Sequence, residues 1–302
     1  MACGYQLMIE ATCDYSVEHT ASADQTKSVF NLRAGAGDTI RLTKFISYHS
    51  SRATPATELV QRCTRTIRRA TDDGLDSIRD EQARWLSEFW DRSDIRVDGD
   101  PHAQQAMRWN LFQLAQASAR THEQGIAAKA VTAAGYEGHY FWDTEIYIVP
   151  FLAYTSPETA RRLVRFRWHM LDAARERARE LNQRGALYPW RTINGEEASA
   201  YYAAGTAQYH INAAVALALK RYLDASGDVG FLADEGAEIL VETARLWEDL
   251  GFWAVNGERQ FHIHGVTGPD EYTAVVNNNL YTNVMARFNM RYAARVVESL
   301  AE

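Results

Sequence analysis

The N-terminal stretch alternates between apolar and polar positions in a way that predicts β-strands. Phe30 and Leu32 are separated by a polar residue, and Ile40 and Leu42 resume the alternation after a Gly-rich turn at 35–38. A period of two places apolar side chains on one face of a strand. The pattern predicts that the two segments form a hairpin. Because two strands rarely make a stable domain alone, this hairpin should belong to a larger sheet.

Beyond Thr57 the apolar spacing changes to three or four residues, which is typical of amphipathic helices. Two helices are expected on either side of Gly74. After Pro101 the chain reads as a succession of helices joined by loops rich in Gly, Pro and aromatic residues. We expect six helices there, over these ranges: from Pro101, then 143–154, 157–181, 205–223, 231–250, and from 278 to the end.

The last of these helices reaches Glu302 without a Gly, Asn or Pro to end it. We therefore expect that the chain is cut at its C-terminus, and the small share of strands suggests the same for its N-terminus.

Composition narrows the class of protein. The chain has 302 residues, 46% of them hydrophobic, with 32 basic against 39 acidic residues and a formal charge of −7. The basic residues are scattered, so neither nucleic acid nor an anionic membrane is expected as a partner. Three cysteines near the N-terminus are a poor disulfide framework, and the sequence shows neither a secretory signal nor a membrane-spanning run. We expect a soluble cytoplasmic protein.

The chemistry-bearing residues lie in three loops, where a rigid scaffold commonly positions functional groups. In the third loop, Gly268 and Pro269 turn the chain and present Asp270, Glu271 and Tyr272. A carboxyl group among aromatic and apolar neighbours keeps its proton to higher pH, as protonation of a glycosidic oxygen requires. Alternatively, Asp270 or Glu271 caps the following helix.

The other two loops combine aromatic rings with charged side chains. Trp142 offers a flat apolar face to a sugar ring, and Asp143 offers an acceptor for its hydroxyls, although Asp143 could instead be a helix N-cap. The second loop carries four residues that suit further hydroxyls: Trp190, Arg191, Glu196 and Glu197. A solvated loop would look much the same.

His262 and His264 alternate along a possible strand near Asp270, which raises the question of a metal site. No second cluster of ligands stands at metal-binding spacing, so a hydrogen-bonded structural pair is the favoured interpretation. The sequence also lacks a Walker loop, a dinucleotide fingerprint and a nucleophile elbow. We expect neither a metal nor a cofactor.

Taken together and in this order, the loops resemble glycoside hydrolase family 65, which contains maltose, trehalose and kojibiose phosphorylases and some trehalases. The similarity covers about two hundred residues. Its strongest parts are Phe-Trp-Asp-Thr-Glu at 141–145 and Gly-Pro-Asp-Glu-Tyr at 268–272. Its other parts are 94–100, 105–112, 138–150 and 189–197.

This resemblance implies a mainly α fold with an N-terminal β-sandwich, a helical linker and a catalytic (α/α)6 barrel. Residues 1–54 would then be the end of the sandwich, 55–99 the linker, and 100–302 the first half of the barrel. The resemblance further implies that the full-length protein is a homodimer.

For the mechanism, the resemblance implies that Glu271 is the general acid and that Trp142 and Asp143 contact the glucose whose bond is broken. Inorganic phosphate would attack with inversion as co-substrate, giving β-glucose 1-phosphate and a free sugar from an α-linked glucose disaccharide. The family's phosphate-binding residues fall in the second half of the barrel, outside this chain. The loop at 189–197 resembles trehalose and kojibiose phosphorylases more than maltose phosphorylases.

Two other functions stay open at this point. A hydrolase of the same family, such as a trehalase, would need a second catalytic carboxylate to activate water. A non-catalytic sugar-binding or structural protein descended from such an enzyme would need none.

Overall fold

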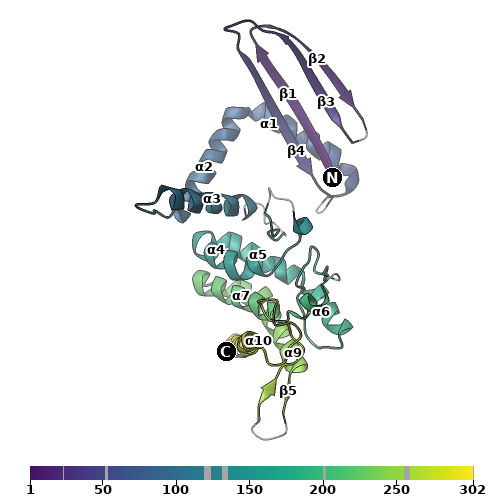
Figure 1. The fold of residues 1–302 in the computed structure, drawn as a ribbon, viewed down its shortest axis with the longest axis vertical. Coiled ribbons are helices and arrows are strands. Elements are labelled where there is room, and N and C mark those ends of the chain that lie inside the picture. Colours follow the sequence, from purple (N-terminus) through teal and green to yellow (C-terminus); the bar gives the residue numbers. More distant parts are fainter. Residues whose placement is uncertain are drawn as a thin grey trace. The chain divides into compact units, whose positions relative to one another are not determined.

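The structure is a computed structural model. It describes residues 1–22, 24–51, 54–118, 124–130, 135–199, 202–254 and 259–301. The chain divides into two compact units, Met1–Glu88 and Phe89–Glu302. Strands β1 to β4 belong to the first unit, and the helices from α3 onward belong to the second (Figure 1).

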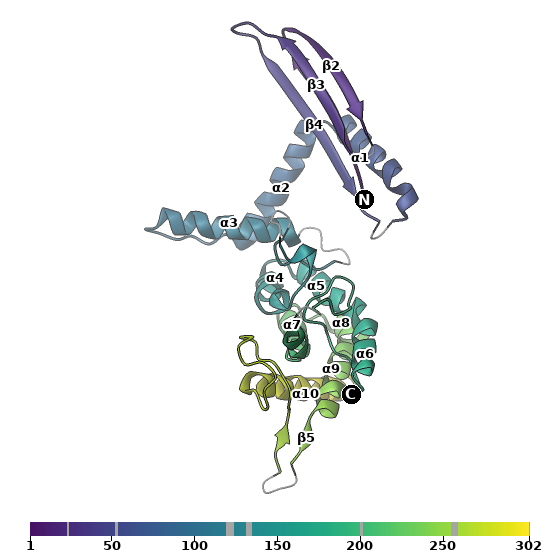
Figure 2. The same ribbon diagram turned by 45° about the vertical axis from the view of Figure 1, so that its right-hand side comes forward.

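The first unit contains two antiparallel strand pairs. Its four strands are β1 (Ala2–Ala11), β2 (Asp14–Ala21), β3 (Thr26–Arg33) and β4 (Ile40–His49). β1 pairs with β4, and β2 pairs with β3 as a hairpin. The β2–β3 hairpin lies next to the β1–β4 pair (Figure 2), and the Tyr5 hydroxyl of β1 is 3.0 Å from Ser28 Oγ of β3.

The predicted pairing of the segments around Phe30 and Leu42 was wrong. Both segments are strands, but Phe30 lies opposite Val17 and Leu42 lies opposite Ile9. Alternation identifies which face of a strand is apolar and says nothing about its neighbour. The two earlier strands, which our sequence analysis did not identify, take both partners.

Helix α1 (Leu59–Asp73) packs on the β1–β4 pair through the predicted stripe of Leu59, Cys63 and Ile67, all buried. The Cys63 thiol donates to the Ala2 carbonyl at 3.4 Å and to the Ser47 carbonyl at 3.7 Å. Helix α2 (Leu75–Ser93) begins after Gly74. The two helices expected here are confirmed.

The second unit is mainly helical. Its longer helices are α3 (Pro101–Ser118), α4 (Val149–Thr155), α5 (Pro157–His169), α6 (Leu171–Glu180), α7 (Ile211–Ser226), α9 (Ala237–Leu250) and α10 (Leu280–Ala301). Its shorter elements are α8 (Val229–Phe231), the strands β5 (Phe252–Trp253) and β6 (Phe261–His262), and π-helical turns at Thr144–Ile148 and Leu232–Gly236. Turns of 3-10 helix occur at Ala56–Glu58 in the first unit, and at Tyr136–Gly138 and Ala203–Ala207 in the second.

The single helix expected over 157–181 is two helices, because the chain bends at Met170. The Arg167 carbonyl accepts the Met170 N–H at 3.1 Å, an i to i+3 bond that tightens the last turn of α5. The same carbonyl accepts the Tyr188 hydroxyl at 2.9 Å. A tertiary contact from a distant loop therefore sets this break, and the local apolar period could not reveal it.

Helix α7 is the centre of the second unit. It packs against α4, α5, α9 and α10 (Figure 1). Nine of its residues are buried: Ile211, Asn212, Ala213, Ala214, Val215, Ala216, Ala218, Leu219 and Tyr222. The sequence predicted one apolar face, but the small side chains between Ile211 and Leu219 let neighbours approach from all sides.

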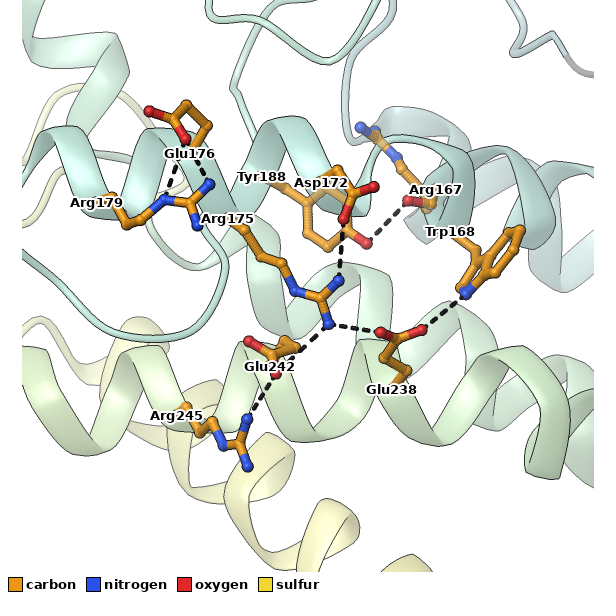
Figure 3. Close-up of polar contacts among 10 residues, drawn as sticks. All are labelled: Arg167, Trp168, Asp172, Arg175, Glu176, Arg179, Tyr188, Glu238, Glu242 and Arg245. Atoms are coloured by element: carbon orange, nitrogen blue, oxygen red, sulfur yellow. Dashed lines mark hydrogen bonds and ion pairs between the residues drawn. The ribbon is translucent and has the colours of Figure 1, made fainter.

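Polar contacts join α6 to α9 on the outside of this core (Figure 3). Arg175 donates to Asp172 at 3.0 Å and to Glu238 at 2.6 Å, and it lies 3.5 Å from Glu242. The Trp168 indole N–H donates to the other oxygen of Glu238 at 3.2 Å. A partly buried network of this kind fixes how the two helices pack more than it adds stability.

Gly185, in the loop after α6, lies so close to α9 that no side chain fits. An added Cβ would lie 2.2 Å from the Glu242 carbonyl oxygen and 2.7 Å from the Leu246 nitrogen, at a φ of +80°. The next residue, Ala186, donates its N–H to that carbonyl at 3.0 Å. The glycine allows the loop to bond directly to the backbone of α9.

We predict that Gly185→Ala lowers the free energy of unfolding by about 3 kcal/mol or more, because a positive φ and a backbone clash add. Gly227→Ala is the matched control: its φ is +66° and nothing lies within 4 Å of an added Cβ. The control should cost about 1 kcal/mol. Urea unfolding measures both values, and equal losses would contradict the close approach.

Candidate active site

A cavity of about 1120 Å³ in the second unit brings together residues that are far apart in the sequence. Four predicted site residues line it: Trp142, Asp143, Trp190 and Glu271. Its wall also includes α3 residues such as Asn110 and Gln113, together with Lys129 and Tyr281. The other three predicted residues, Arg191, Glu196 and Glu197, are not among the described residues of its lining.

Trp142 and Asp143 stand at the start of the π-helical turn that leads into α4. Trp142 is half-buried, with its ring edge-on to that of His210 at 4.8 Å. Asp143 is exposed, and its side chain makes no capping hydrogen bond to the turn that follows. The capping alternative for Asp143 is therefore not supported, and Asp143 lines the cavity next to Trp142.

A buried ion pair holds this loop in place. Arg167 donates to the two oxygens of Glu145 at 2.7 and 2.9 Å, and their side chains are 3% and 4% exposed. Burial alone would lower the pKa of Arg167, but the charge and hydrogen bonds of Glu145 outweigh it and raise that pKa. The Arg167 backbone also accepts the Tyr188 hydroxyl, visible in Figure 3. Two of the three loops thus share one anchor.

The second loop places Trp190 against other aromatic rings. Trp190 is buried, and its ring meets those of Phe141 and Tyr202 edge-on at 5.6 Å each. A Cβ on Gly205 would lie 2.6 Å from this indole, so the glycine is what allows the ring to sit there. Trp190 therefore forms a fixed part of the cavity wall.

Glu197 serves the backbone of its own loop. It accepts the N–H of Trp190 at 2.8 Å, the N–H of Arg191 at 3.2 Å and the Ser199 hydroxyl at 2.5 Å. It also pairs with Arg177 at 2.7 Å. Burial outweighs this attraction and lowers the pKa of Arg177. The contacts that the sequence assigned to sugar hydroxyls are here made within the protein.

Arg191 and Glu196 belong to the same loop as Glu197 but make different contacts. Buried Arg191 donates to Glu137 at 2.9 Å and lies 3.2 Å from His139 Nδ1. Glu196 is exposed and accepts the Asn194 amide at 2.9 Å. Arg191 joins the second loop to the first, and Glu196 faces solvent.

Glu271 occupies the tip of a tight turn with a φ of +62°. Its N–H donates to the Gly268 carbonyl at 3.1 Å, and the Gly268 N–H donates to the Thr273 carbonyl at 2.8 Å. Asp270 accepts the Thr273 hydroxyl at 2.5 Å, which lowers the pKa of Asp270. The two adjacent carboxylates are thus distinguished, since Asp270 builds the turn and Glu271 extends from it.

The capping alternative for this pair was wrong. Helix α10 begins at Leu280, and the residue that caps it is Asn279, whose Oδ1 accepts the Thr282 N–H at 3.1 Å. Asp270 and Glu271 lie too far upstream to serve that helix.

The neighbours of Glu271 differ from those expected. Tyr272 is 95% exposed, and Glu271 itself is exposed. Gln208 donates its amide to Glu271 Oε1 at 3.3 Å, and the Tyr202 hydroxyl donates to the Glu271 backbone carbonyl at 3.2 Å. The sequence led us to expect aromatic and apolar neighbours around this carboxyl group. In the structure, the amide of Gln208 holds it instead.

Sequence reasoning missed Gln208 and His210, which precede α7. Gln208 is 2% exposed and His210 is 0% exposed, and His210 Nε2 lies 3.3 Å from Gln208 Oε1. Burial lowers the pKa of His210 to about 4. The available signal was a pair of polar residues just before a helix whose first nine residues, 211–219, are apolar except for Asn212.

The histidine pair considered as a metal site is part of a ring cluster. His262 stacks on Phe252 with ring centroids 5.7 Å apart, His264 meets the same ring edge-on at 4.8 Å, and Asn278 bonds to His262 Nδ1 at 2.8 Å. In the part of the chain that the structure describes, no group of three or more His, Cys, Asp or Glu is arranged to hold a metal ion. The same part holds no helix with the length and apolar composition to cross a membrane.

Comparison with known proteins identifies the class. Residues 2–89 match the family model for the glycosyl hydrolase family 65 N-terminal domain, and residues 108–302 match that for the family 65 central catalytic domain. The chain therefore belongs to glycosyl hydrolase family 65.

Among individual relatives, the chain is 49% identical to an α,α-trehalose phosphorylase of Thermoanaerobacter brockii, over 99% of this chain and 39% of the relative. It is 36% identical to a kojibiose phosphorylase of Escherichia coli K12, over 86% and 37% respectively. A solved structure described as "Putative kojibiose phosphorylase from human microbiome" superposes with a TM-score of 0.82 at 26% identity, over 98% of this chain and 39% of that one. The chain thus spans less than two fifths of the length of these proteins.

We predict that Glu145→Gln lowers the free energy of unfolding by about 3 to 5 kcal/mol, because it leaves the Arg167 charge buried without a partner. Glu158→Gln is the matched control, since Glu158 pairs with Arg162 at 3.2 Å but is 64% exposed. That change should cost less than about 1 kcal/mol. Similar losses for the two variants in chemical denaturation would refute the anchoring role.

The buried imidazole predicts a pH dependence of stability. His210 binds a proton near pH 4 when folded and near its ordinary value of 6.5 when unfolded. The unfolded state therefore binds more protons in this window, so stability falls as the pH drops from about 6.5 to 4, by up to about 3 kcal/mol. Comparing unfolding free energies of wild type and His210→Phe at pH 7 and pH 5 isolates this contribution; equal changes would exclude it.

Proposed function

We propose that the full-length protein carrying this chain phosphorolyses an α-linked glucose disaccharide with inversion, giving β-glucose 1-phosphate and a free sugar. The observation that carries the proposal is the single cavity lined by Trp142, Asp143, Trp190 and Glu271. Its volume of about 1120 Å³ can hold a disaccharide together with phosphate. The trehalose, kojibiose and maltose phosphorylases among the relatives support phosphorolysis.

In the proposed mechanism, a glucose ring lies on Trp142 and its hydroxyls bond to Asp143. Glu271 gives its proton to the glycosidic oxygen as the bond to the anomeric carbon breaks and the electron pair leaves with that oxygen. A phosphate oxygen bonds to the opposite face of the oxocarbenium-like centre, which inverts its configuration. Phosphate is already anionic, so this reaction needs no second carboxylate and no cofactor.

The remaining predicted site residues receive narrower roles. Arg191 and Glu197 support the proposal by fixing the loop that carries Trp190, through the bonds described above. Glu196 stays a predicted sugar contact, because it is the exposed carboxylate of this loop. Trehalose and kojibiose remain the favoured substrates.

We also propose the larger architecture implied by the family: the end of a β-sandwich at 1–54, a linker at 55–99 and half of an (α/α)6 barrel at 100–302. Homodimerisation and a cytoplasmic location belong to the same proposal. The three free cysteines are consistent with a reducing compartment. Light scattering of the full-length protein would test the dimer.

The test incubates the full-length protein with trehalose, kojibiose and maltose, with and without inorganic phosphate, and assays glucose 1-phosphate and glucose. Phosphate-dependent formation of β-glucose 1-phosphate supports the proposal. Release of glucose alone, independent of phosphate, would show a hydrolase. Binding of the sugars without either product would show a non-catalytic protein.

We predict that Glu271→Gln lowers kcat by at least about 1000-fold while the dissociation constant for the disaccharide changes less than about threefold, because only proton donation is lost. Glu176→Gln is the control: Glu176 is an exposed carboxylate on α6 that pairs with Arg179. It should keep wild-type turnover. Undiminished turnover in Glu271→Gln would remove this residue as the acid.

A further inference from the structure

We propose that Gln208 and His210 position the carboxyl group of Glu271, so that one of its oxygens is held and the other faces the bond to be broken. The inference rests on the proposed function, because it assigns positioning residues to the proposed acid. It concerns two buried side chains before α7 to which the proposed mechanism gives no other role.

Hydrogen-bonding capacity fixes the order of the contacts. With the acid's proton on Oε2, where the proposed mechanism needs it, Glu271 Oε1 only accepts hydrogen bonds. The atom of Gln208 that lies 3.3 Å from Oε1 must then be its amide nitrogen. The amide oxygen then points to His210 Nε2, also at 3.3 Å, and an oxygen there requires an N–H partner. The proton of His210 is therefore assigned to Nε2.

The other ring nitrogen agrees with this assignment. His210 Nδ1 is buried and has no hydrogen-bond partner among the described residues. An N–H at Nδ1 would be a buried donor without an acceptor, and Nε2 and Gln208 Oε1 would then present two lone pairs to each other. Burial also keeps the ring neutral above about pH 4, so it carries a single proton.

The direction of these hydrogen bonds decides which atom of Gln208 faces Glu271. Without the His210 N–H, the Gln208 amide could rotate and present its oxygen to Glu271, where it would accept the carboxyl proton that the glycosidic oxygen needs. With that N–H in place, Gln208 donates to Oε1 and leaves Oε2 for the glycosidic oxygen. Glu271 is exposed at the tip of a turn, so this amide limits the freedom that its side chain would otherwise have. Misplacement of a catalytic group by about 1 Å can cost about 100-fold in rate.

The imidazole of His210 also packs against Trp142, the ring on which the glucose is proposed to lie. Its ring lies edge-on to Trp142 at 4.8 Å and to Tyr281 at 5.5 Å, and both of those residues line the cavity. One buried side chain thus links the aromatic face proposed to bind the glucose to the amide that holds the acid.

The test compares variants of the full-length protein in the phosphorolysis assay. Gln208→Met removes the amide at similar volume, and we expect kcat to fall about 10- to 100-fold with KM within about threefold of wild type. His210→Phe should lower kcat about 10-fold. His210→Gln should restore most of this loss, because the Gln amide can place an N–H where Nε2 lies.

A double-mutant cycle shows whether His210 acts on kcat through Gln208, which we call a relay, or whether the two residues act independently. If His210 acts through Gln208, His210→Phe should lower kcat less than about twofold in the Gln208→Met background. The control is Asn289→Leu, which removes a fully buried amide bonded to Trp247 and Thr243. It should lower thermal stability and leave the kcat of the folded protein within about twofold.

Three kinetic outcomes would overturn the inference: wild-type kcat in Gln208→Met, equal costs of His210→Phe in both backgrounds, or a loss confined to KM. If the wild type hydrolyses the sugars, the proposed function fails, and the same variants assayed for glucose release still decide the positioning roles.

The ¹⁵N spectrum of histidine-labelled protein, with His210→Gln for assignment, gives a readout independent of turnover. A neutral ring protonated at Nε2 is expected at pH 7, and protonation at Nδ1 would overturn the relay.

Discussion

The arrangement of the candidate site depends on the buried ion pair between Glu145 and Arg167. Glu145 belongs to the same short stretch as Trp142 and Asp143, so its position fixes where these two side chains lie. Arg167 stands in the last turn of α5, and its backbone carbonyl receives the Tyr188 hydroxyl from the second loop. Two charges taken out of water must be paired almost ideally to be tolerated, and this requirement leaves the loops little freedom.

The third loop reaches the cavity by a different route. Thr267 donates its N–H to the Ala207 carbonyl at 3.0 Å, which attaches the turn of Glu271 to the segment just before α7. Gln208 and His210 belong to that segment. Eight of the nine residues from Ile211 to Leu219 in α7 are buried, so the stretch that precedes this helix is a firm base for both Glu271 and Trp142. The proposed chemistry thus rests on the most enclosed helix of the second unit.

Most of the helices and several residues of the cavity wall could be predicted from the sequence. The features that could not be predicted have a common physical cause. Apolar spacing identified the helices around Gly74 and the helical nature of the rest, because burial of one face leaves a periodic trace. The three loops singled out in the sequence each contribute to one cavity, as its lining by Trp142, Trp190 and Glu271 shows, and the roles of these residues stay predictions. Strand pairing at Phe30, the break at Met170 and the amide that holds Glu271 all arise from contacts between distant segments. Such contacts leave no local pattern, and the carboxylate of Glu197 illustrates this: its loop bonds could not be distinguished from sugar contacts by residue type alone.

We propose that this cavity holds the glucose ring with Glu271 at the bond to be broken. The most direct measurement is a crystal structure of the full-length Glu271→Gln variant with bound disaccharide. We expect a glucose ring lying on Trp142, its hydroxyls bonded to Asp143, and the glycosidic oxygen within about 3.2 Å of the side chain at position 271. A disaccharide bound away from Trp142, or one whose glycosidic oxygen faces another carboxylate, would contradict it.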